Sequence, residues 1–147
     1  MYSEIHEYLY VGSANAITSA NKFDLIINCT PDMREPKHCT QFIRLPIRDD
    51  PDDIDNALSI INKTGILAVI HSAISSHQHV LVHCYAGEQR SCAIVSCYLI
   101  RYKGMSTTEA VEYIRDRHEY AFNGGVDLIE LIEKIESQTR EQQQLQH

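Results

Sequence analysis

A strand-length apolar run at residues 79–83 (HVLVH) is followed by a short turn and then by an apolar run of helical length, residues 91–102. Strands that lead through a short loop into a helix are typical of folds in which helices cover a sheet. Three more strand-length runs precede this unit, at residues 8–11, 25–29 and 41–47. The stretch at residues 14–21 suits a helix. We therefore predict an α/β fold with a central, mostly parallel sheet of about four to five strands flanked by helices.

Two further helical regions are indicated by apolar spacing and by end signals. Apolar residues spaced as on one helix face extend over residues 54–74, but their phase slips near Gly65, so we expect two helical pieces or a kink there. Ser106 and Glu109 have the spacing of a capping box and predict the start of another helix.

The C-terminal part of the chain indicates one more helix and a tail. An amphipathic helix is expected after the turn signal at residues 123–125, and its polar end, from Ser137 onward, is expected to fray. A chain of 147 residues suffices for one hydrophobic core and is short for two. We therefore predict a single domain over residues 1–140 and a polar tail over residues 141–147.

Composition points to an intracellular protein. No run approaches the roughly 18 uncharged apolar residues of a membrane span, and residues 1–10 lack the basic and apolar regions of a signal peptide. The five cysteines are odd in number and form no CxxC pair. This pattern favours thiols in a reducing compartment over a disulfide framework or a zinc site. We expect a cytoplasmic location.

The formal net charge of −7 limits the classes of partner. Nucleic acids and anionic membrane surfaces both bind clustered Lys and Arg, so neither is expected as a partner. A small site can still be locally positive, through backbone N–H groups and a single arginine. A monomer is the default expectation.

The loop between the strand at residues 79–83 and the following helix carries the most informative segment, HCYAGEQRS, from His83 to Ser91. Free N–H groups of such a loop and of the helix start point into one concavity that binds a tetrahedral oxyanion. Gly87 permits a sharp turn, and Arg90 presents a planar fork that can hold two phosphate oxygens. The residues expected to bind phosphate are Tyr85, Ala86, Gly87, Glu88, Gln89 and Arg90.

The same positive environment suits a reactive cysteine at the start of the loop. A thiol that faces a helix N-terminus and an arginine ionises more readily than an ordinary thiol, so we expect Cys84 to be a thiolate and a nucleophile. The Ser91 hydroxyl could donate to it. Taken singly, a buried cysteine is usually structural and an arginine at a helix start is usually a solvated charge. Their combination in one strand–loop–helix unit favours catalysis, with Cys84, Arg90 and Ser91 as catalytic residues.

The segment HCYAGEQRS resembles the HCxxGxxR[ST] signature of the protein tyrosine phosphatase superfamily, and the chain is similar to its compact dual-specificity branch, which includes small poxvirus-type enzymes. The similarity extends over nearly the whole chain, through EYLYVGS, LIINCTPD, LPIRDD and CYLIRYKGMSTTEAVEYIR. It implies a phosphoprotein phosphatase that hydrolyses phosphotyrosine, and phosphoserine and phosphothreonine as well, through a phosphocysteine. It implies no metal ion and no organic cofactor.

The resemblance also implies roles for residues outside the loop. LPIRDD resembles the family's general-acid segment, which assigns the acid to Asp49; Asp50 is the main alternative, and Asp52 and Asp53 are interpreted as a helix start. Asn123 resembles an asparagine that braces the phosphate loop, although Asn-Gly-Gly is also a plain turn signal. We expect His83 to hold the shape of the loop.

Cys29 is a further hypothesis from the resemblance. Some family members use a cysteine at this place for a protective disulfide with the catalytic cysteine, here Cys84. A buried structural thiol is the alternative reading. Cys92 and Cys97 are interpreted as core residues.

The resemblance leaves rival substrates and functions open. The superfamily includes phosphoinositide phosphatases and RNA triphosphatases, which benefit from basic residues at the pocket, whereas here Glu88 is acidic. A phosphoprotein substrate is therefore favoured. A silent phosphoprotein-binding module would have no need for the full catalytic set, and sulfur transfer or arsenate reduction is the third alternative.

Overall fold

The structure, a computed structural model, describes residues 1–33 and 41–145. Within these residues the strands form one five-stranded sheet in the order β1-β2-β5-β3-β4. The strands are β1 (Tyr2–His6), β2 (Leu9–Gly12), β3 (Leu25–Asn28), β4 (Gln41–Arg44) and β5 (Val80–His83). All neighbouring pairs are parallel except β1 with β2, which is antiparallel. The predicted α/β fold with a mostly parallel sheet is confirmed.

Strand β1 is the element that the sequence does not predict. Of its residues only Ile5 is buried, so the segment has no apolar run that would indicate a strand. The pairing comes from the tight reversal before β2, where Tyr8 has a φ of +70°. β1 therefore depends on its neighbour and lies at the edge of the sheet.

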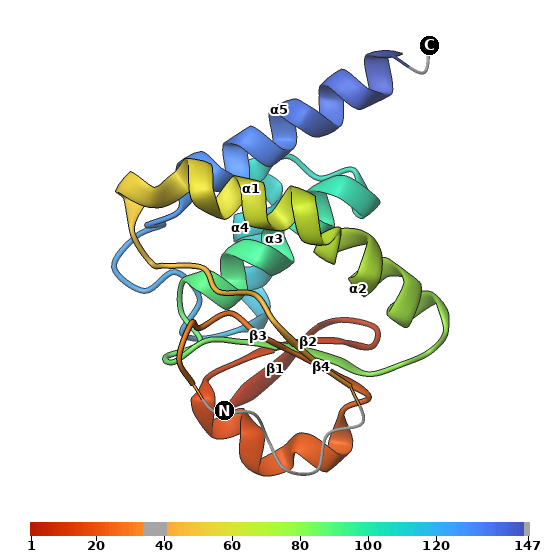
Figure 1. Ribbon diagram of the computed structural model, residues 1–147, viewed down its shortest axis with the longest axis vertical. Coiled ribbons are helices and arrows are strands. Elements are labelled where there is room, and N and C mark those ends of the chain that lie inside the picture. Colours follow the sequence, from red (N-terminus) through yellow and green to blue (C-terminus); the bar gives the residue numbers. More distant parts are fainter. Residues whose placement is uncertain (34–40, 146–147) are drawn as a thin grey trace.

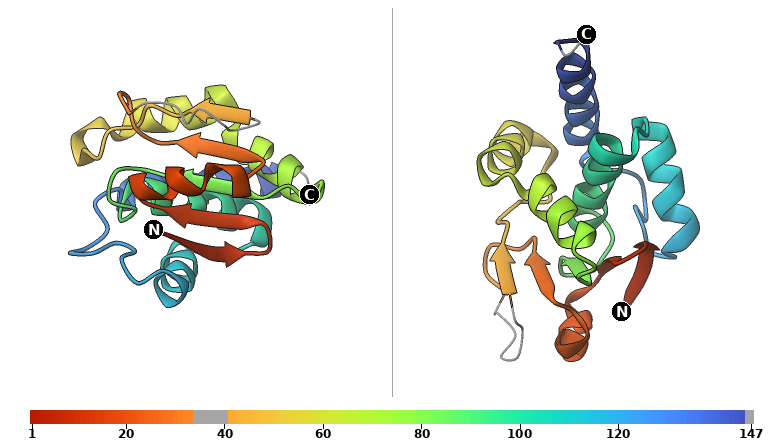
Figure 2. Two further views of the ribbon diagram at one scale, coloured as in Figure 1. Left: turned by 90° about the horizontal axis from the view of Figure 1, so that it is seen from below. Right: turned by 90° about the vertical axis from the view of Figure 1, so that its right-hand side faces the viewer.

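The helices lie on both faces of the sheet (Figure 1 and Figure 2). In the described part of the chain, the five α-helices cover one face, and the 3-10 segment η1 lies against the other. They are η1 (Ala14–Lys22), η2 (Pro51–Asp53), α1 (Ile54–Thr64), α2 (Ile66–Ser75), α3 (Arg90–Lys103), α4 (Thr107–Arg117) and α5 (Ile129–Leu145). Helix α3 is central, with every residue from 91 to 100 buried, including Cys92 and Cys97.

Alternation along the inner strands divides the core between the two faces. Ile26 of β3 and Leu81 of β5 pack with Phe23 on the η1 side. Their neighbours Ile27 and Val82 belong to the larger core beneath the α-helices. Because β3 and β5 are covered on both faces, all of their residues are buried and they appear in the sequence as unbroken apolar runs.

Two of the predicted helix ends are confirmed. Gly65 has a φ of +63° and separates α1 from α2, which accounts for the phase slip in the apolar pattern. The capping box is present: the Ser106 hydroxyl accepts from the Glu109 N–H, and the Glu109 carboxylate accepts from the Ser106 N–H, both at 3.1 Å.

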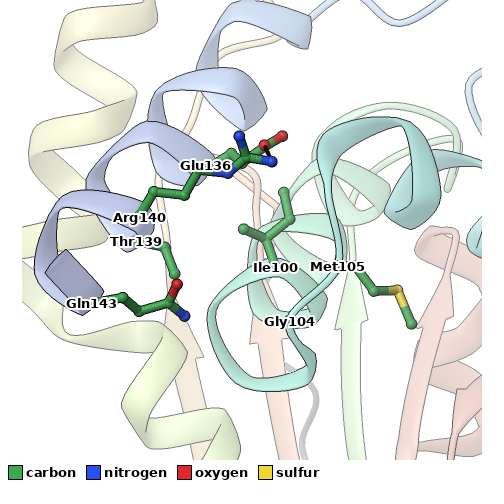
Figure 3. Close-up of a pocket in the computed structure, with 7 residues that line it drawn as sticks. All are labelled: Ile100, Gly104, Met105, Glu136, Thr139, Arg140 and Gln143. Carbon is green, nitrogen blue, oxygen red and sulfur yellow. Dashed lines mark ion pairs between the residues drawn. The ribbon is translucent and has the colours of Figure 1, made fainter. Parts of the chain in front are cut away.

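The expected fraying from Ser137 is wrong, because α5 continues to Leu145 and its last turns project from the body (Figure 1). Thr139 is buried, accepts a hydrogen bond from Arg101 Nε at 2.8 Å and donates to Ile135 O. Figure 3 shows the small pocket where α5 meets the α3–α4 connection, lined in part by Glu136 and Arg140, which form an ion pair. The boundary between domain and tail at residue 140 stays a prediction.

Over residues 1–33 and 41–145, no single helix is both long and apolar enough to cross a membrane. The pair formed by Pro51–Thr64 and Ile66–Ser75 meets the length and composition criteria only when the two are taken together across a 46° bend.

Candidate active site

The loop at residues 84–91, here called the phosphate loop, connects the carboxyl end of β5 to α3. Parallel strands β2 and β3 flank β5 on either side, so all three end at the same edge of the sheet. Cys84 is 2% exposed at the base of the loop, and α3 begins at Arg90. The predicted strand–loop–helix geometry therefore places the cysteine below a helix N-terminus, where an anion is favoured.

The Cys84 thiol has one close polar neighbour inside the loop. Its Sγ lies 3.2 Å from Ser91 Oγ, and Ser91 is fully buried. A hydroxyl is the better donor of the two when the sulfur is ionised, so Ser91 is arranged to donate to a thiolate. The structure thus brings these two predicted site residues together.

Gly87 is confined by the end of β2. Its φ is +73°, and a Cβ atom there would lie 2.8 Å from both the Gly12 carbonyl carbon and the Ser13 nitrogen. Distances below 3.0 Å to backbone atoms are not tolerated without movement of one chain. Glycine is therefore required here both by conformation and by space.

His118 braces the same turn of the loop, and sequence reasoning did not single it out. Its Nε2 lies 2.8 Å from Gly87 O, a carbonyl that can only accept, so Nε2 carries the proton. Nδ1 then accepts from the Ser3 hydroxyl at 2.7 Å. Burial is the main cause that lowers the pKa of His118, which keeps the imidazole neutral. Ser3 lies far away in the sequence, so no local pattern could have indicated this pair.

Arg90 is held at the rim by two neighbours. Its Nη1 donates to Ile47 O at 3.3 Å, and its guanidinium carbon lies 5.5 Å from the centre of the Tyr85 ring. The Tyr85 hydroxyl donates to the Asp32 carboxylate, and the tyrosine is 46% exposed. Tyr85 therefore forms part of the wall of the site, and its contact with Asp32 was not predicted.

The acidic segment that follows Ile47 divides into two roles. Asp50 accepts from the Asp52 N–H at 2.9 Å and caps η2, and Asp53 accepts from the Asn56 side chain at 3.3 Å. Asp49 is close enough to Arg90 to interact electrostatically with it. Asp49 is thus the carboxylate of this segment that is linked to a residue of the phosphate loop through its charge.

The pKa of Asp49 is raised above its ordinary value. The causes are partial burial of the carboxyl group, then repulsion by and hydrogen bonding to Asp127, with Arg90 opposing the shift. Sequence reasoning did not identify Asp127 as a site residue. Asp127 is distant from Asp49 in the sequence and lies in the turn that precedes α5.

Gln89 fastens that turn to the phosphate loop. Its Nε2 donates to Asn123 O at 3.2 Å and to Gly125 O at 2.8 Å, and its Oε1 accepts from the Asp127 N–H at 3.1 Å. Glu88 contributes its backbone carbonyl, which accepts from Phe122 N at 2.8 Å. Asn123 is exposed, and within the described residues its contact with the loop is through its backbone carbonyl rather than its side chain.

His83 and Cys29 both lie fully buried behind the nucleophile. His83 Nδ1 is 3.4 Å from Cys84 O, and burial is the main cause that lowers the pKa of this histidine. Cys29 follows β3 and donates its N–H to His83 O at 2.8 Å, so it lies beside Cys84 across neighbouring strands. Burial, and then the Cys84 thiol, raise the pKa of the Cys29 thiol well above its ordinary value. Both cysteines are unbonded thiols here, and Cys39 lies outside the described residues.

In the part of the chain that the structure describes, no group of three or more His, Cys, Asp or Glu side chains could hold a metal ion.

Comparisons with known proteins agree with this geometry. A sequence model of the dual-specificity phosphatase catalytic domain matches residues 8–138. A protein of Invertebrate iridescent virus 6, provisionally named tyrosine phosphatase 123R, is 33% identical over 122 residues, which are 82% of each chain. Mouse dual specificity protein phosphatase 8 is 28% identical over 122 residues, which are 78% of this chain but 18% of that protein. The crystal structure of human DUSP28 is similar in fold, with a TM-score of 0.82 at 23% identity over 95% of both chains.

The domain match covers the whole sheet from β2 onward, the phosphate loop and most of α5. The enzyme class follows from it. The chain belongs to the dual-specificity phosphatases, in the protein tyrosine phosphatase superfamily.

Proposed function

We propose that this phosphatase hydrolyses phosphotyrosine, and phosphoserine and phosphothreonine as well, without a metal ion and through a phosphocysteine on Cys84. The observation that carries the proposal is the 3.2 Å contact between Cys84 Sγ and Ser91 Oγ, inside a loop that leads into the N-terminus of α3. A structural thiol in the core would need neither the hydroxyl nor the helix start.

In the first step the Cys84 thiolate attacks phosphorus and the bond from phosphorus to the ester oxygen breaks. The loop N–H groups and Arg90 hold the phosphoryl oxygens, whose charge is spread in the transition state. Asp49 gives its proton to the departing oxygen, for which its raised pKa is suited. The products are a phosphocysteine, a free hydroxyl on the substrate and an ionised Asp49.

In the second step water attacks the same phosphorus and the sulfur–phosphorus bond breaks. Asp49 takes the proton from the water, and the electron pair returns to Cys84. Ser91 donates a hydrogen bond to the sulfur as it becomes a thiolate again. Inorganic phosphate leaves and the enzyme regains its starting protonation.

The charges around the site support a protein substrate over an RNA end or a multiply phosphorylated lipid headgroup. Apart from Arg90, the charged side chains discussed at the rim are acidic: Asp32 beside Tyr85, Glu88 in the loop, and Asp127 beside Asp49. Highly charged anionic substrates are repelled by such a rim, whereas a single phosphate on a neutral or basic peptide is not.

Site-resolved phosphate release tests the proposal. A peptide carrying both phosphothreonine and phosphotyrosine is incubated with the wild type, with Cys84→Ser, and with Cys97→Ser as a control for a buried cysteine of α3. Loss of both phosphates with the wild type and Cys97→Ser, but not Cys84→Ser, is expected and should persist with EDTA. Release of phosphate from phosphotyrosine alone would restrict the proposed specificity to phosphotyrosine. No phosphate release from either site by a folded, reduced enzyme would refute a protein substrate.

A further inference from the structure

Two neighbouring residues of the phosphate loop each hold a segment that carries an acid. Gln89 binds the turn at residues 123–127 through three hydrogen bonds, the last from the Asp127 N–H. Arg90 binds Ile47 O, two residues before Asp49. The two segments come from distant parts of the sequence and meet across the mouth of the site, where the Asp49 and Asp127 carboxyl groups are within hydrogen-bonding reach of each other.

We propose that Asp127 is a positioning residue for the general acid, whose carboxylate accepts a hydrogen bond from the protonated Asp49 and keeps that proton at the mouth of the site between turnovers. This inference rests on the proposed role of Asp49. It adds a residue that the phosphate-loop signature does not contain.

The pair has a defined division of charge. Two carboxylates in contact repel each other when both are ionised, so the pair favours the state in which one of them carries a proton. Asp49 has the raised pKa, from partial burial and then from Asp127, and is therefore the member that holds the proton.

The other charges that face Asp49 either lower its pKa or raise it only slightly. Arg90 lowers the pKa of Asp49, and Asp50 of the same segment raises it least among the causes. Asp50 is occupied in capping η2, and its contribution does not depend on Asp127. Without Asp127, burial is the main influence that still opposes Arg90, so Asp49 should lose its proton at lower pH than in the wild type.

The test is the pH profile of kcat/KM for a phosphotyrosine peptide, with Asp127→Asn as the variant. The alkaline limb of such a profile reports loss of the acid's proton. Asparagine keeps the shape and the backbone N–H, but removes the charge and donates to Asp49. The alkaline limb of the Asp127→Asn profile should therefore move to lower pH. Asp49→Asn should lose about 100-fold or more in kcat/KM, and the kcat/KM of Asp127→Asn near neutral pH should be intermediate between that variant and the wild type.

Three further measurements separate positioning from a structural effect. Glu130→Gln removes one exposed charge in the first turn of α5 that is not among the charges acting on Asp49, and it should keep the wild-type profile. With p-nitrophenyl phosphate, whose leaving group needs little protonation, Asp127→Asn should lose little rate. In an Asp49→Asn background, Asp127→Asn should have no further effect, because it acts through Asp49.

The outcomes also separate this inference from the proposed function. A wild-type profile for Asp127→Asn would overturn the inference, as would an equal loss with both substrates or an additive loss in the double variant, while release that depends on Cys84 would leave the phosphocysteine mechanism intact. No release from the wild type that depends on Cys84 would overturn both.

Discussion

Replacing Gly87 by alanine tests whether the contact between the phosphate loop and β2 confines the loop, and Gly65→Ala is its matched control. Both glycines have φ values in the left-handed region, +73° and +63°. A Cβ at position 65 meets nothing within 4 Å, whereas one at position 87 lies 2.8 Å from two backbone atoms of β2 and the residue after it. The pair therefore separates the cost of conformation from the cost of crowding.

The free energy of unfolding should fall in both variants, by different amounts. The left-handed conformation costs an alanine about 1–2 kcal/mol, and this cost applies in full at each of the two positions. Crowding adds about 1–3 kcal/mol at position 87 alone, because a backbone neighbour cannot rotate away as a side chain can. Gly87→Ala should thus lose about 2–5 kcal/mol in total, a large part of the stability of a domain of this size.

Urea unfolding followed by circular dichroism measures the difference, and phosphate release measures its consequence. Gly65→Ala should keep wild-type kcat/KM, since Gly65 lies between α1 and α2 and outside the phosphate loop. Gly87→Ala should lose at least about tenfold, because relief of the contact shifts the N–H groups that bind the phosphate. Equal stabilities for the two variants would refute the claim that β2 confines the loop.

Three other predictions follow from the buried groups around the loop. Ser91→Ala should slow breakdown of the phosphocysteine by about 10- to 100-fold, the range expected for loss of a hydrogen bond to a charged group. Stopped-flow kinetics should then show a burst of the first product, and the absence of a burst would contradict this role of Ser91. Burial lowers the pKa of His83 and of His118 below the ordinary 6.5, so the folded state binds fewer protons than the unfolded chain; the free energy of unfolding should decline as pH falls below about 6.5, and less steeply in His118→Gln. After mild peroxide treatment, mass spectrometry should detect a peptide that links Cys29 to Cys84, and its absence would leave Cys29 as a core thiol.

The sequence was sufficient for the parts of the fold that depend on local pattern. The inner strands are buried on both faces and appear as apolar runs, Gly65 interrupts the helical phase, and the Ser106–Glu109 box marks a helix start. Each of these signals is contained within a few consecutive residues. The exceptions are β1, whose single buried residue leaves no pattern, and the end of α5, which Thr139 fastens through Arg101 of α3.

The residues of the candidate site likewise fall into those that a local sequence pattern indicates and those that only the folded chain brings together. The signature from His83 to Ser91 is continuous in the chain, so its residues could be proposed together. His118, Asp127 and Asp32 could not, because each meets the loop through a contact formed only in the folded chain. For Asn123 the resemblance indicated the right segment, but the contact observed is made by its backbone carbonyl.

The phosphate loop must therefore perform two tasks with one short segment. Its inner side has to leave N–H groups free for a phosphate, so it is held from outside, by carbonyl and side-chain contacts that face away from the substrate. Gly87 O accepts from His118, Glu88 O accepts from Phe122, and Gln89 fastens the turn before α5. Because these outer contacts come from separate elements, loosening one should widen the loop at one residue and leave the others in place. His118→Ala should accordingly weaken phosphate binding more than it slows proton transfer, whereas a change at Gln89 should do the reverse by releasing Asp127 from Asp49.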